Sequence, residues 1–243
     1  MPDNDSVGIN LGAGAYWSAP NWMSLDEEAG TILNESSTLL TKDESLLAAF
    51  SCHFFEHVDN ATSKKLFSEV HRILKPGGYF RIVVPDFGKL IEKYLENDLE
   101  WFHKDVGFAG RNEWGRYGVP QDITSILLHF LSNFDFQGPK GFYRGGPIEI
   151  DREELRKRAT TNSVGELCDW VHSHIPIDDD RVKTQHINWW TAEKFIEMLK
   201  DAGFSEAYQS EFGATQCNLM RGSHFDLEKP NRRKFSLYVE AVK

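Results

Sequence analysis

Short apolar runs alternate with one-sided helical patterns through the first part of the chain. Residues 7–11 and 46–55 are apolar runs, and the first of them ends in the turn Gly12-Ala13-Gly14. Apolar side chains recur at helical spacing over residues 62–74, while residues 79–84 are mostly β-branched or aromatic. Apolar strands that alternate with amphipathic helices predict an α/β fold, in which a parallel sheet carries helices on its faces.

The pattern changes near residue 99 and returns near residue 186. Residues 122–134, 152–159 and 164–174 have helical periodicity, and glycine-rich stretches lie among them. This region therefore predicts a mostly helical insertion. The α/β pattern then resumes with a helix from Thr191 to Gly203 and two β-rich segments before the end of the sequence.

Length and composition fit a single folded domain. The 243 residues are enough for a sizeable core, which we expect at about 7–98 and 186–243, around an insertion at about 99–185. Lys and Arg number 27 against 37 Asp and Glu, which gives a formal net charge of -10. This excess of acid argues against nucleic acid and against an anionic membrane surface as partners, because both attract basic proteins.

Cysteine usage and the start of the sequence indicate a cytoplasmic protein. Cys52, Cys168 and Cys217 are an odd number without C-x-x-C spacing, which argues against a disulfide framework and a cysteine-rich zinc site. The sequence starts Met1-Pro2-Asp3, acidic where a signal peptide would be basic. Its uncharged stretch at 6–25 is too rich in Gly, Asn, Ser and Pro to span a bilayer. We expect no membrane insertion and no metal.

Two features near the start of the chain could bind a nucleotide-like ligand. At Gly12-Ala13-Gly14 a ligand could approach the backbone closely, because a Cβ there would collide with it. A dinucleotide fingerprint would need a further glycine where Trp17 stands, so a plain strand-to-helix turn is the alternative. Asp26 stands where a second strand could end, and its carboxylate could accept hydrogen bonds from ribose hydroxyls. The alternative is a surface Asp at the head of an acidic run.

Further motifs accompany these two features along the chain. In order, the set is Asn10-Leu11-Gly12-Ala13-Gly14, Trp22 with Leu25-Asp26, Ser51-Cys52-His53-Phe54-Phe55-Glu56-His57, Leu74-Lys75-Pro76-Gly77-Gly78, Val83-Val84-Pro85-Asp86, Trp190-Thr191, Ala202-Gly203-Phe204 and Leu237-Tyr238-Val239-Glu240-Ala241-Val242-Lys243. With these motifs the chain resembles the class I S-adenosylmethionine-dependent methyltransferases, most closely the "type 11" group often encoded among cell-envelope polysaccharide genes. The resemblance covers residues 7–96 and 186–243 well and the insertion poorly.

The resemblance implies a Rossmann-like fold, with a mostly parallel sheet, flanking helices, an antiparallel last strand and a helical insertion after the fifth strand. It also implies S-adenosyl-L-methionine as the cofactor and S-adenosyl-L-homocysteine as the product. Gly12 and Gly14 would line the methionine half of the cofactor, and Asp26 would hold its ribose. Asn34 stands where the family usually has an Asp that reads the adenine edge. The implied cofactor-binding residues are Asn10, Gly12, Ala13, Gly14, Asp26, Asn34, Ser51, Cys52 and His53.

The chemistry of methyl transfer points to histidines as candidate catalytic residues. Transfer from a sulfonium depends on holding the acceptor in line at ~3 Å from the methyl carbon, and a hydroxyl acceptor also benefits from a general base. The candidates are His53 and His57 near the end of a strand and His186 before the last helix. For each of them a structural hydrogen bond is the alternative. The region from Gly12 to Asp26 holds Pro20, so we expect the first helix of the fold to be short or irregular.

The leading hypothesis is a methyltransferase that acts on a hydroxyl or amine of a small molecule, with a sugar or glycolipid intermediate as the best guess. The insertion would form the acceptor pocket and lid, and Arg221 and His224 could face an anionic acceptor or simply lie at the surface. The run Asp178-Asp179-Asp180 could bind a divalent metal but is more typical of a solvated loop. The second hypothesis is a catalytically inactive module that binds S-adenosylmethionine, because Asn34 replaces the Asp that the family usually has at the adenine edge. The third is a nicotinamide oxidoreductase. The acceptor and the oligomeric state stay open.

Overall fold

The protein divides into two compact units. The computed structural model describes residues 6–14, 16–26, 33–105, 122–132, 150–175, 185–225 and 232–243. The first unit comprises the described residues of Met1–Val84, Ala192–Glu228 and Ser236–Lys243, and the second those of Pro85–Thr191 and Lys229–Phe235. The boundary lies at Pro85, so the helix after this residue groups with the second unit, whereas the sequence pattern placed it in the core.

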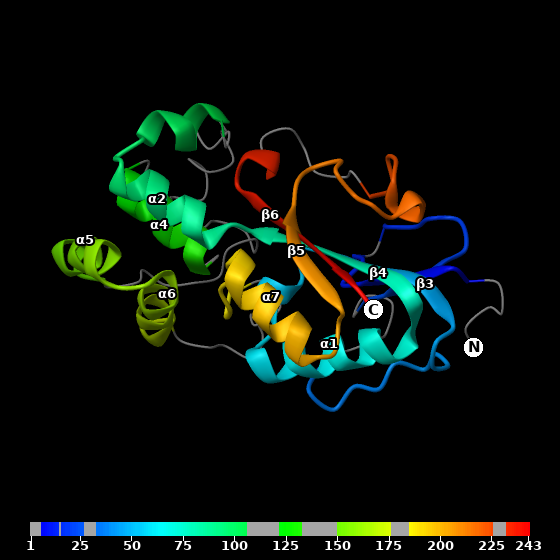
Figure 1. The fold of residues 1–243 in the computed structure, drawn as a ribbon. Helices are drawn as coiled ribbons and strands as arrows, with labels where there is room; N and C mark the ends of the chain where they lie inside the picture. Colours follow the sequence, from blue (N-terminus) through cyan, green and yellow to red (C-terminus); the bar gives the residue numbers. More distant parts are fainter. Residues whose placement is uncertain are drawn as a thin grey trace. The chain divides into compact units, whose positions relative to one another are not determined.

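A six-stranded mixed sheet forms the centre of the first unit (Figure 1). Its strands are β1 (Gly8–Leu11), β2 (Trp22–Leu25), β3 (Leu46–Cys52), β4 (Leu74–Pro85), β5 (Glu206–Ser210) and β6 (Ser236–Val242). They follow the order β2-β1-β3-β4-β6-β5. The pairs β1–β2, β1–β3 and β3–β4 are parallel, and β5 and β6 are antiparallel. The predicted α/β fold, with its mostly parallel sheet, antiparallel end and flanking helices, is confirmed.

The helical insertion follows β4, which is the fourth strand along the described chain. The family pattern counts this strand as the fifth, because it places another strand between β2 and β3. The described residues 33–45, which precede β3, contain turns and bends and no strand. The end of the sheet beyond β2 is therefore shorter, over the described residues, than the family pattern predicts.

Two helices of the first unit cover one face of this sheet. They are α1 (Asn60–Ile73) and α7 (Ala192–Asp201), which lie side by side (Figure 1). Phe67 of α1 and Phe195 of α7 pack together, with ring centroids 6.0 Å apart, and Phe67 also contacts Phe80 of β4. All three rings are fully buried, and burying a side chain of this size contributes ~1.5–3 kcal/mol. The amphipathic pattern of residues 62–74 thus gives the predicted helix, which begins two residues earlier at Asn60.

Loops and the short 3-10 helix η3 (Asn218–Met220), rather than α-helices, cover the opposite face of the first unit over its described residues. Between Gly12 and Asp26 the described chain forms turns and β2 and no helix, where we expected a short or irregular helix. The indole of Trp22 lies so close to Gly8 that a Cβ on this glycine would be 2.8 Å from the ring. Trp22 in turn packs against Phe225, with ring centroids 4.7 Å apart, and Phe225 contacts Phe50 of β3. Segments from both ends of the chain therefore close this face with aromatic rings.

The Lys-Pro-Gly-Gly motif lies inside β4 rather than in front of it. β4 begins at Leu74, pairs with Leu46, and resumes regular pairing with β3 at Tyr79 after an irregularity. Gly77 has a φ of 76°, which favours glycine, and its N–H donates to the carbonyl of Lys243. The strand predicted at 79–84 thus extends over Leu74–Pro85, because the backbone of Gly77 and Gly78 forms hydrogen bonds with the backbone of Lys243.

The second unit is helical in its described part. Its helices are α2 (Phe87–Leu95), the short π-helix η2 (Trp101–Asp105), α4 (Ile123–Ser132), α5 (Arg152–Thr161), α6 (Val164–Ser173) and the 3-10 helix η4 (Arg232–Lys234). The three helices predicted for the insertion are confirmed, and α2 begins after Asp86, whose side chain accepts a hydrogen bond from Lys89 N, as an N-cap does. The predicted acidic run Asp178-Asp179-Asp180 lies outside the described residues.

Two further expectations concern membranes and disulfides. Over the described ranges, the helices are too short or too polar for any of them to cross a bilayer. All three cysteines lie in described segments, and no disulfide joins any two of them.

Candidate functional site

Three neighbouring strands of the first unit end at the same level. Leu11, the last residue of β1, pairs with Leu25 at the end of β2 and with Ser51 near the end of β3. The hydroxyl of Ser51 donates a hydrogen bond of 3.0 Å to the carbonyl of Leu11 and ties two of these ends together. The residues that follow, Gly12, Asp26 and His53, consequently leave the sheet along one edge. This is the carboxyl edge, where α/β proteins bind their ligands.

The glycine turn after β1 is held against the end of β2. The N–H groups of Gly12 and Ala13 both donate to the carbonyl of Leu25, at 2.8 and 3.2 Å. The N–H of Gly14 donates to Oδ2 of Asp26 at 3.0 Å. Asp26 is only partly buried and lies directly after β2, as predicted. The structure thus brings Asp26 and the glycine turn together through a hydrogen bond that the sequence did not predict.

The two glycines of this turn are required for different reasons. Gly12 and Gly14 have φ angles of 68° and 70°, in the left-handed region that favours glycine. A Cβ on Gly12 would lie 2.5 Å from the side chain of Phe54, so this ring already occupies the space that the absent side chain leaves. A Cβ on Gly14 would meet no atom of the described residues within 4 Å. Gly12 is thus packed by the protein itself, whereas Gly14 is exposed and required for its backbone conformation.

Asn10 is a buried polar residue, one position before the end of β1. It lies on β1 between Ser24 of β2 and Phe50 of β3, and it is 2% exposed. Its side-chain oxygen Oδ1 has no hydrogen-bond partner among the described residues. An unpartnered buried oxygen costs ~1–3 kcal/mol, so Asn10 marks a place where a donor would stabilise the protein.

The end of β3 carries an imidazole–carboxylate pair that the sequence did not reveal. His53 Nδ1 lies 3.0 Å from Oε1 of Glu56, and the same oxygen lies 3.9 Å from Nε2 of His57. Glu56 is 1% exposed, whereas the side chains of His53 and His57 are 17% and 20% exposed. A carboxylate at Nδ1 favours the tautomer that donates from Nδ1, which makes Nε2 of His53 the proton-accepting nitrogen. The pair therefore has the arrangement of a general base and the group that orients it.

Backbone geometry holds His53 in this position. Its φ of 53° is in the left-handed region, which non-glycine residues adopt rarely, and its N–H donates to the carbonyl of Val83 at 2.8 Å. Glu56 follows in the short helix η1 (Phe55–His57), three residues after His53. The sequence offered one signal for this role: Glu56 is the one acidic residue in an otherwise apolar and histidine-containing run. The left-handed turn that brings Glu56 to His53 leaves no pattern in the sequence.

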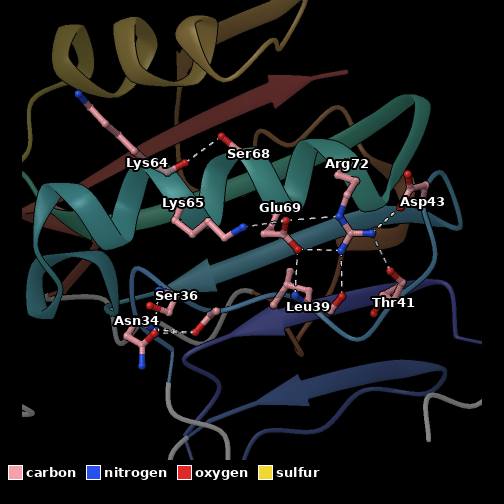
Figure 2. Close-up of polar contacts among 11 residues, drawn as sticks. Asn34, Ser36, Leu39, Thr41, Asp43, Lys64, Lys65, Ser68, Glu69 and Arg72 are labelled. Atoms are coloured by element: carbon pink, nitrogen blue, oxygen red, sulfur yellow. Dashed lines mark hydrogen bonds and ion pairs between the residues drawn. The ribbon is translucent and has the colours of Figure 1, made fainter.

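Cys52 and Asn34 have less direct relations to this edge. Cys52 is the last residue of β3 and packs against the apolar cluster that contains Phe50 and Cys217. The side-chain oxygen of Asn34 accepts a hydrogen bond of 2.9 Å from Ser36 N, so this oxygen closes a local turn (Figure 2). The adenine-reading role implied for Asn34 would therefore fall to the amide nitrogen of its side chain, which is a donor where an Asp would be an acceptor.

Arg221 and His224 lie together in the loop after η3 (Asn218–Met220). The guanidinium of Arg221 turns back onto the carbonyl of Thr215, at 3.3 and 3.4 Å from Nη2 and Nε. The carbonyl of His224 accepts a hydrogen bond of 2.8 Å from Trp17 Nε1. Both residues are exposed, and the interactions described for them support the loop that covers the sheet. Their role as acceptor-binding residues stays a prediction.

His186 belongs to the second unit. Its Nδ1 lies 2.8 Å from the carbonyl of Phe130, and its N–H donates to the carbonyl of Ser132 at 2.8 Å. Its ring packs against Phe87, with centroids 6.2 Å apart. These contacts fix the segment before α7 to the end of α4. His186 thus makes the structural hydrogen bonds that were the alternative to a catalytic role.

Comparison with known proteins adds a chemical class to this geometry. Residues 20–82 match the model of a methyltransferase domain family. The matched segment contains Asp26, Asn34 and the turn from His53 to His57, while the glycine turn and His186 lie outside it. No curated protein gives a significant match.

Several solved structures are similar to the chain at low sequence identity. One is a chain in the complex between the Haloferax volcanii Trm112 methyltransferase activator and a methyltransferase, with 13% identity, a TM-score of 0.40, and coverage of 98% of this chain and 82% of that one. Another is the S-adenosylmethionine-dependent methyltransferase from Mesorhizobium loti, with 17% identity, a TM-score of 0.40, and coverage of 99% and 93%. A third is phosphoethanolamine N-methyltransferase 2 of Haemonchus contortus in complex with S-adenosyl-L-methionine, with 11% identity, a TM-score of 0.41, and coverage of 98% and 48%.

Proposed function

We propose that the chain is an S-adenosylmethionine-dependent methyltransferase whose reaction centre lies at the carboxyl edge of β1, β2 and β3. One observation carries this proposal: the pairing of Leu11 with Leu25 and Ser51 aligns the ends of these strands, so that the glycine turn, Asp26 and His53 share one edge. The match of residues 20–82 to a methyltransferase domain supports methyl transfer as the reaction and S-adenosyl-L-methionine as the cofactor.

The residues at this edge fit that cofactor. The buried Oδ1 of Asn10 needs an N–H donor, and the ammonium group of S-adenosylmethionine is one. Asp26, held by Gly14 N, is a carboxylate that suits ribose hydroxyls, and Gly14 itself is exposed. When bound, the cofactor supplies a methyl group attached to a positively charged sulfur that leaves readily.

His53 is the general base of the proposed reaction. With Nδ1 hydrogen-bonded to Glu56, its Nε2 can take the proton of an acceptor hydroxyl while the oxygen is methylated. Glu56 keeps the imidazole in the required tautomer and stabilises the imidazolium that forms. His57 lies farther from the shared carboxylate, at 3.9 Å, and we assign it no proton transfer.

The acceptor we favour is a hydroxyl of a small polar molecule, with a sugar or glycolipid intermediate as the best candidate. A base is more useful for a hydroxyl than for a neutral amine, which is nucleophilic before it loses a proton. The helical insertion, which the family model does not match, is the part that we expect to select this acceptor. The formal charge of -10 is consistent with an acceptor other than nucleic acid.

A thermal-shift experiment tests the cofactor assignment. S-adenosylmethionine or S-adenosylhomocysteine at 100 times its Kd adds ~2.7 kcal/mol of stability. For a chain of this length, that raises the melting temperature by about 5–10 °C. NAD should cause no shift, and a shift with NAD alone would favour the oxidoreductase reading. No shift with either sulfur compound at millimolar concentration would rule the proposal out.

A binding module without turnover is a second candidate, favoured by the use of the Asn34 oxygen in a local turn. This candidate predicts the same thermal shift but no transfer of a labelled methyl group to any member of a broad panel of sugars, glycolipids and amines. Transfer to one member of the panel would reject it. The turnover experiments described in the Discussion then identify the base.

A further inference from the structure

The described chain that leads into β3 approaches the sheet as a loop, residues 34–43, instead of as a strand. Near its middle, Leu39 is buried while Leu40 is 88% exposed, so the loop must be fixed in one orientation. Its own backbone bonds join near neighbours, such as Ser37 N with the carbonyl of Asn34 and Thr41 N with the carbonyl of Leu39. Bonds of such short range give the loop its turns but do not fix its place on the protein.

Two side chains of α1 supply that fixation (Figure 2). Oε2 of Glu69 accepts a hydrogen bond of 2.9 Å from Leu39 N. The guanidinium of Arg72 donates to the carbonyls of Leu39 and Thr41, both at 2.9 Å, and to Oδ1 of Asp43 at 2.6 Å. Arg72 and Glu69 are themselves joined at 2.7 Å. Together they satisfy backbone groups that a strand in this place would offer to the sheet.

The charges of this pair are stable in the folded protein. Burial, the largest influence, would raise the pKa of Glu69, but the hydrogen bonds from Arg72, Leu39 N and Lys65 lower the pKa below its ordinary value. The hydrogen bond to Glu69 is the main reason that the pKa of Arg72 is raised. Both groups therefore stay ionised at neutral pH. A planar guanidinium can reach two carbonyls and a carboxylate at once, whereas an ammonium is a single point charge.

The loop held in this way carries Asn34, the residue that the family resemblance places at the adenine edge of the cofactor. We propose that Arg72 and Glu69 are positioning residues, which hold the 34–43 loop, and with it Asn34, where the adenine base of the cofactor is bound. This inference rests on the proposed function. Neither side chain touches the cofactor; they act through the backbone of Leu39 and Thr41.

The test compares Arg72→Met with Lys65→Met. Lys65 also contacts Glu69, at 3.2 Å, but has no described hydrogen bond to the loop, so its substitution removes the same charge from the same carboxylate and serves as a matched control. Titration calorimetry with S-adenosylhomocysteine should show a Kd at least tenfold higher for Arg72→Met and within twofold of the unmodified protein for Lys65→Met. The Kd of Arg72→Lys should lie between these two values, because lysine keeps the positive charge but lacks the planar guanidinium that reaches several acceptors at once.

A second ligand distinguishes positioning from general damage to the fold. S-inosylhomocysteine differs from S-adenosylhomocysteine only in its base, and the ratio of the two Kd values measures how well the protein reads that base. We expect the ratio to differ from one in the unmodified protein and in Lys65→Met, and to approach one in Arg72→Met. Damage elsewhere would weaken both ligands equally and leave the ratio unchanged.

Several outcomes would overturn the inference. A Kd for S-adenosylhomocysteine that does not change in Arg72→Met, or a ratio of one in the unmodified protein, would mean that the pair serves stability alone. If Arg72→Met does not fold, the milder variant Glu69→Gln takes its place. It should raise the Kd for S-adenosylhomocysteine at least threefold and bring the ratio of the two Kd values closer to one. If it does neither, the inference is refuted. If the unmodified protein binds neither ligand, the proposed function fails and the inference with it. Amide hydrogen exchange of residues 34–43 tests the positioning role without any ligand. Faster exchange in Arg72→Met would show that the clamp, meaning the hydrogen bonds of Arg72 and Glu69 to this loop, has been lost, even if the proposed function fails.

Discussion

Two carboxylates at the same edge of the sheet show how position changes the use of one chemical group. Asp26, after β2, is partly exposed and accepts a backbone N–H from Gly14. Glu56, after β3, is buried and faces the imidazole of His53. The first arrangement leaves a carboxylate near solvent, which suits the binding of a ligand. The second removes a carboxylate from water beside a titratable ring, which suits control of a proton.

From this comparison we propose that the end of β2 at Asp26 serves cofactor binding and the end of β3 at His53 serves turnover. Substitutions at the end of β2 should change the Kd of the cofactor, and those at the end of β3 should change kcat.

The largest effect is expected for His53→Gln, which removes the base. Once an acceptor hydroxyl has been found, kcat should fall ~10²–10⁴-fold, the range of general base catalysis. The Kd for S-adenosylhomocysteine should stay within threefold. His57→Gln, one turn later, is the control and should lower kcat less than tenfold. Equal losses in kcat for the two variants, or a loss confined to binding, would break the assignment of turnover to His53.

Glu56→Gln should lower kcat by ~10–100-fold, because the amide can still accept a hydrogen bond from Nδ1 but no longer stabilises an imidazolium by its charge. The side chains have the same shape, so the fold should persist. Proton NMR provides an independent reading: the downfield resonance of a Nδ1–H bonded to a carboxylate should be present in the unmodified protein and shifted or lost in the variant. An unchanged spectrum would show that Glu56 does not hold His53.

Asp26→Ala should raise the Kd for S-adenosylhomocysteine at least tenfold, since hydrogen bonds to a charged acceptor are worth ~1.5–3 kcal/mol each. Asp26→Asn sharpens the result, because its amide oxygen can keep the bond to Gly14 N while the charge is lost. Calorimetry of both variants then separates the charge of Asp26 from its support of the turn. If kcat at saturating cofactor falls by a larger factor than the affinity does, the two strand ends are not separate in function.

The smallest effect is expected from acid and sets the conditions for these comparisons. His129 lies in α4, and complete burial lowers its pKa to about 3. Histidine in the unfolded chain has a pKa of ~6.5, so between these values the unfolded state binds the additional proton, and stability falls as the pH falls. The free energy of unfolding should decrease by ~1 kcal/mol between pH 7.5 and pH 6.

Urea titrations at the two pH values measure this loss. His129→Gln should show a smaller difference between them, and an equal difference would mean that another group is responsible. Activity should therefore be compared above pH 7, so that acid loss of the fold is not mistaken for titration of the base.

Much of the core followed from local patterns. The run 7–11 with its glycines predicted β1 and the turn after it, and the periodicity of 62–74 predicted α1. Asp86, at the end of the motif Val83-Val84-Pro85-Asp86, accepts a hydrogen bond from Lys89 N at the start of α2, as an N-cap does. These features could be predicted because each depends on residues a few positions apart, where helix spacing, caps and positive φ leave a direct mark on the sequence.

Other features could not be read in this way. The role of Glu56 depends on a left-handed φ at His53, a residue that carries no glycine signal. The clamp on the 34–43 loop joins Arg72 to residues 29 to 33 positions earlier. The division at Pro85 depends on which helices pack together rather than on any linker composition.

The sequence by itself determined the strands, the principal helices and the residues that stand at the strand ends, because local sterics and hydrophobic periodicity act within a few residues. Only the tertiary structure decided which of these residues meet. It set the carboxylate of Glu56 against His53 and that of Asp26 against Gly14. It also closed one face of the sheet with Trp17 and the loop at His224, whose hydrogen bond joins residues 207 positions apart. Such contacts form because burial of apolar surface is non-directional and brings together whatever the topology places side by side.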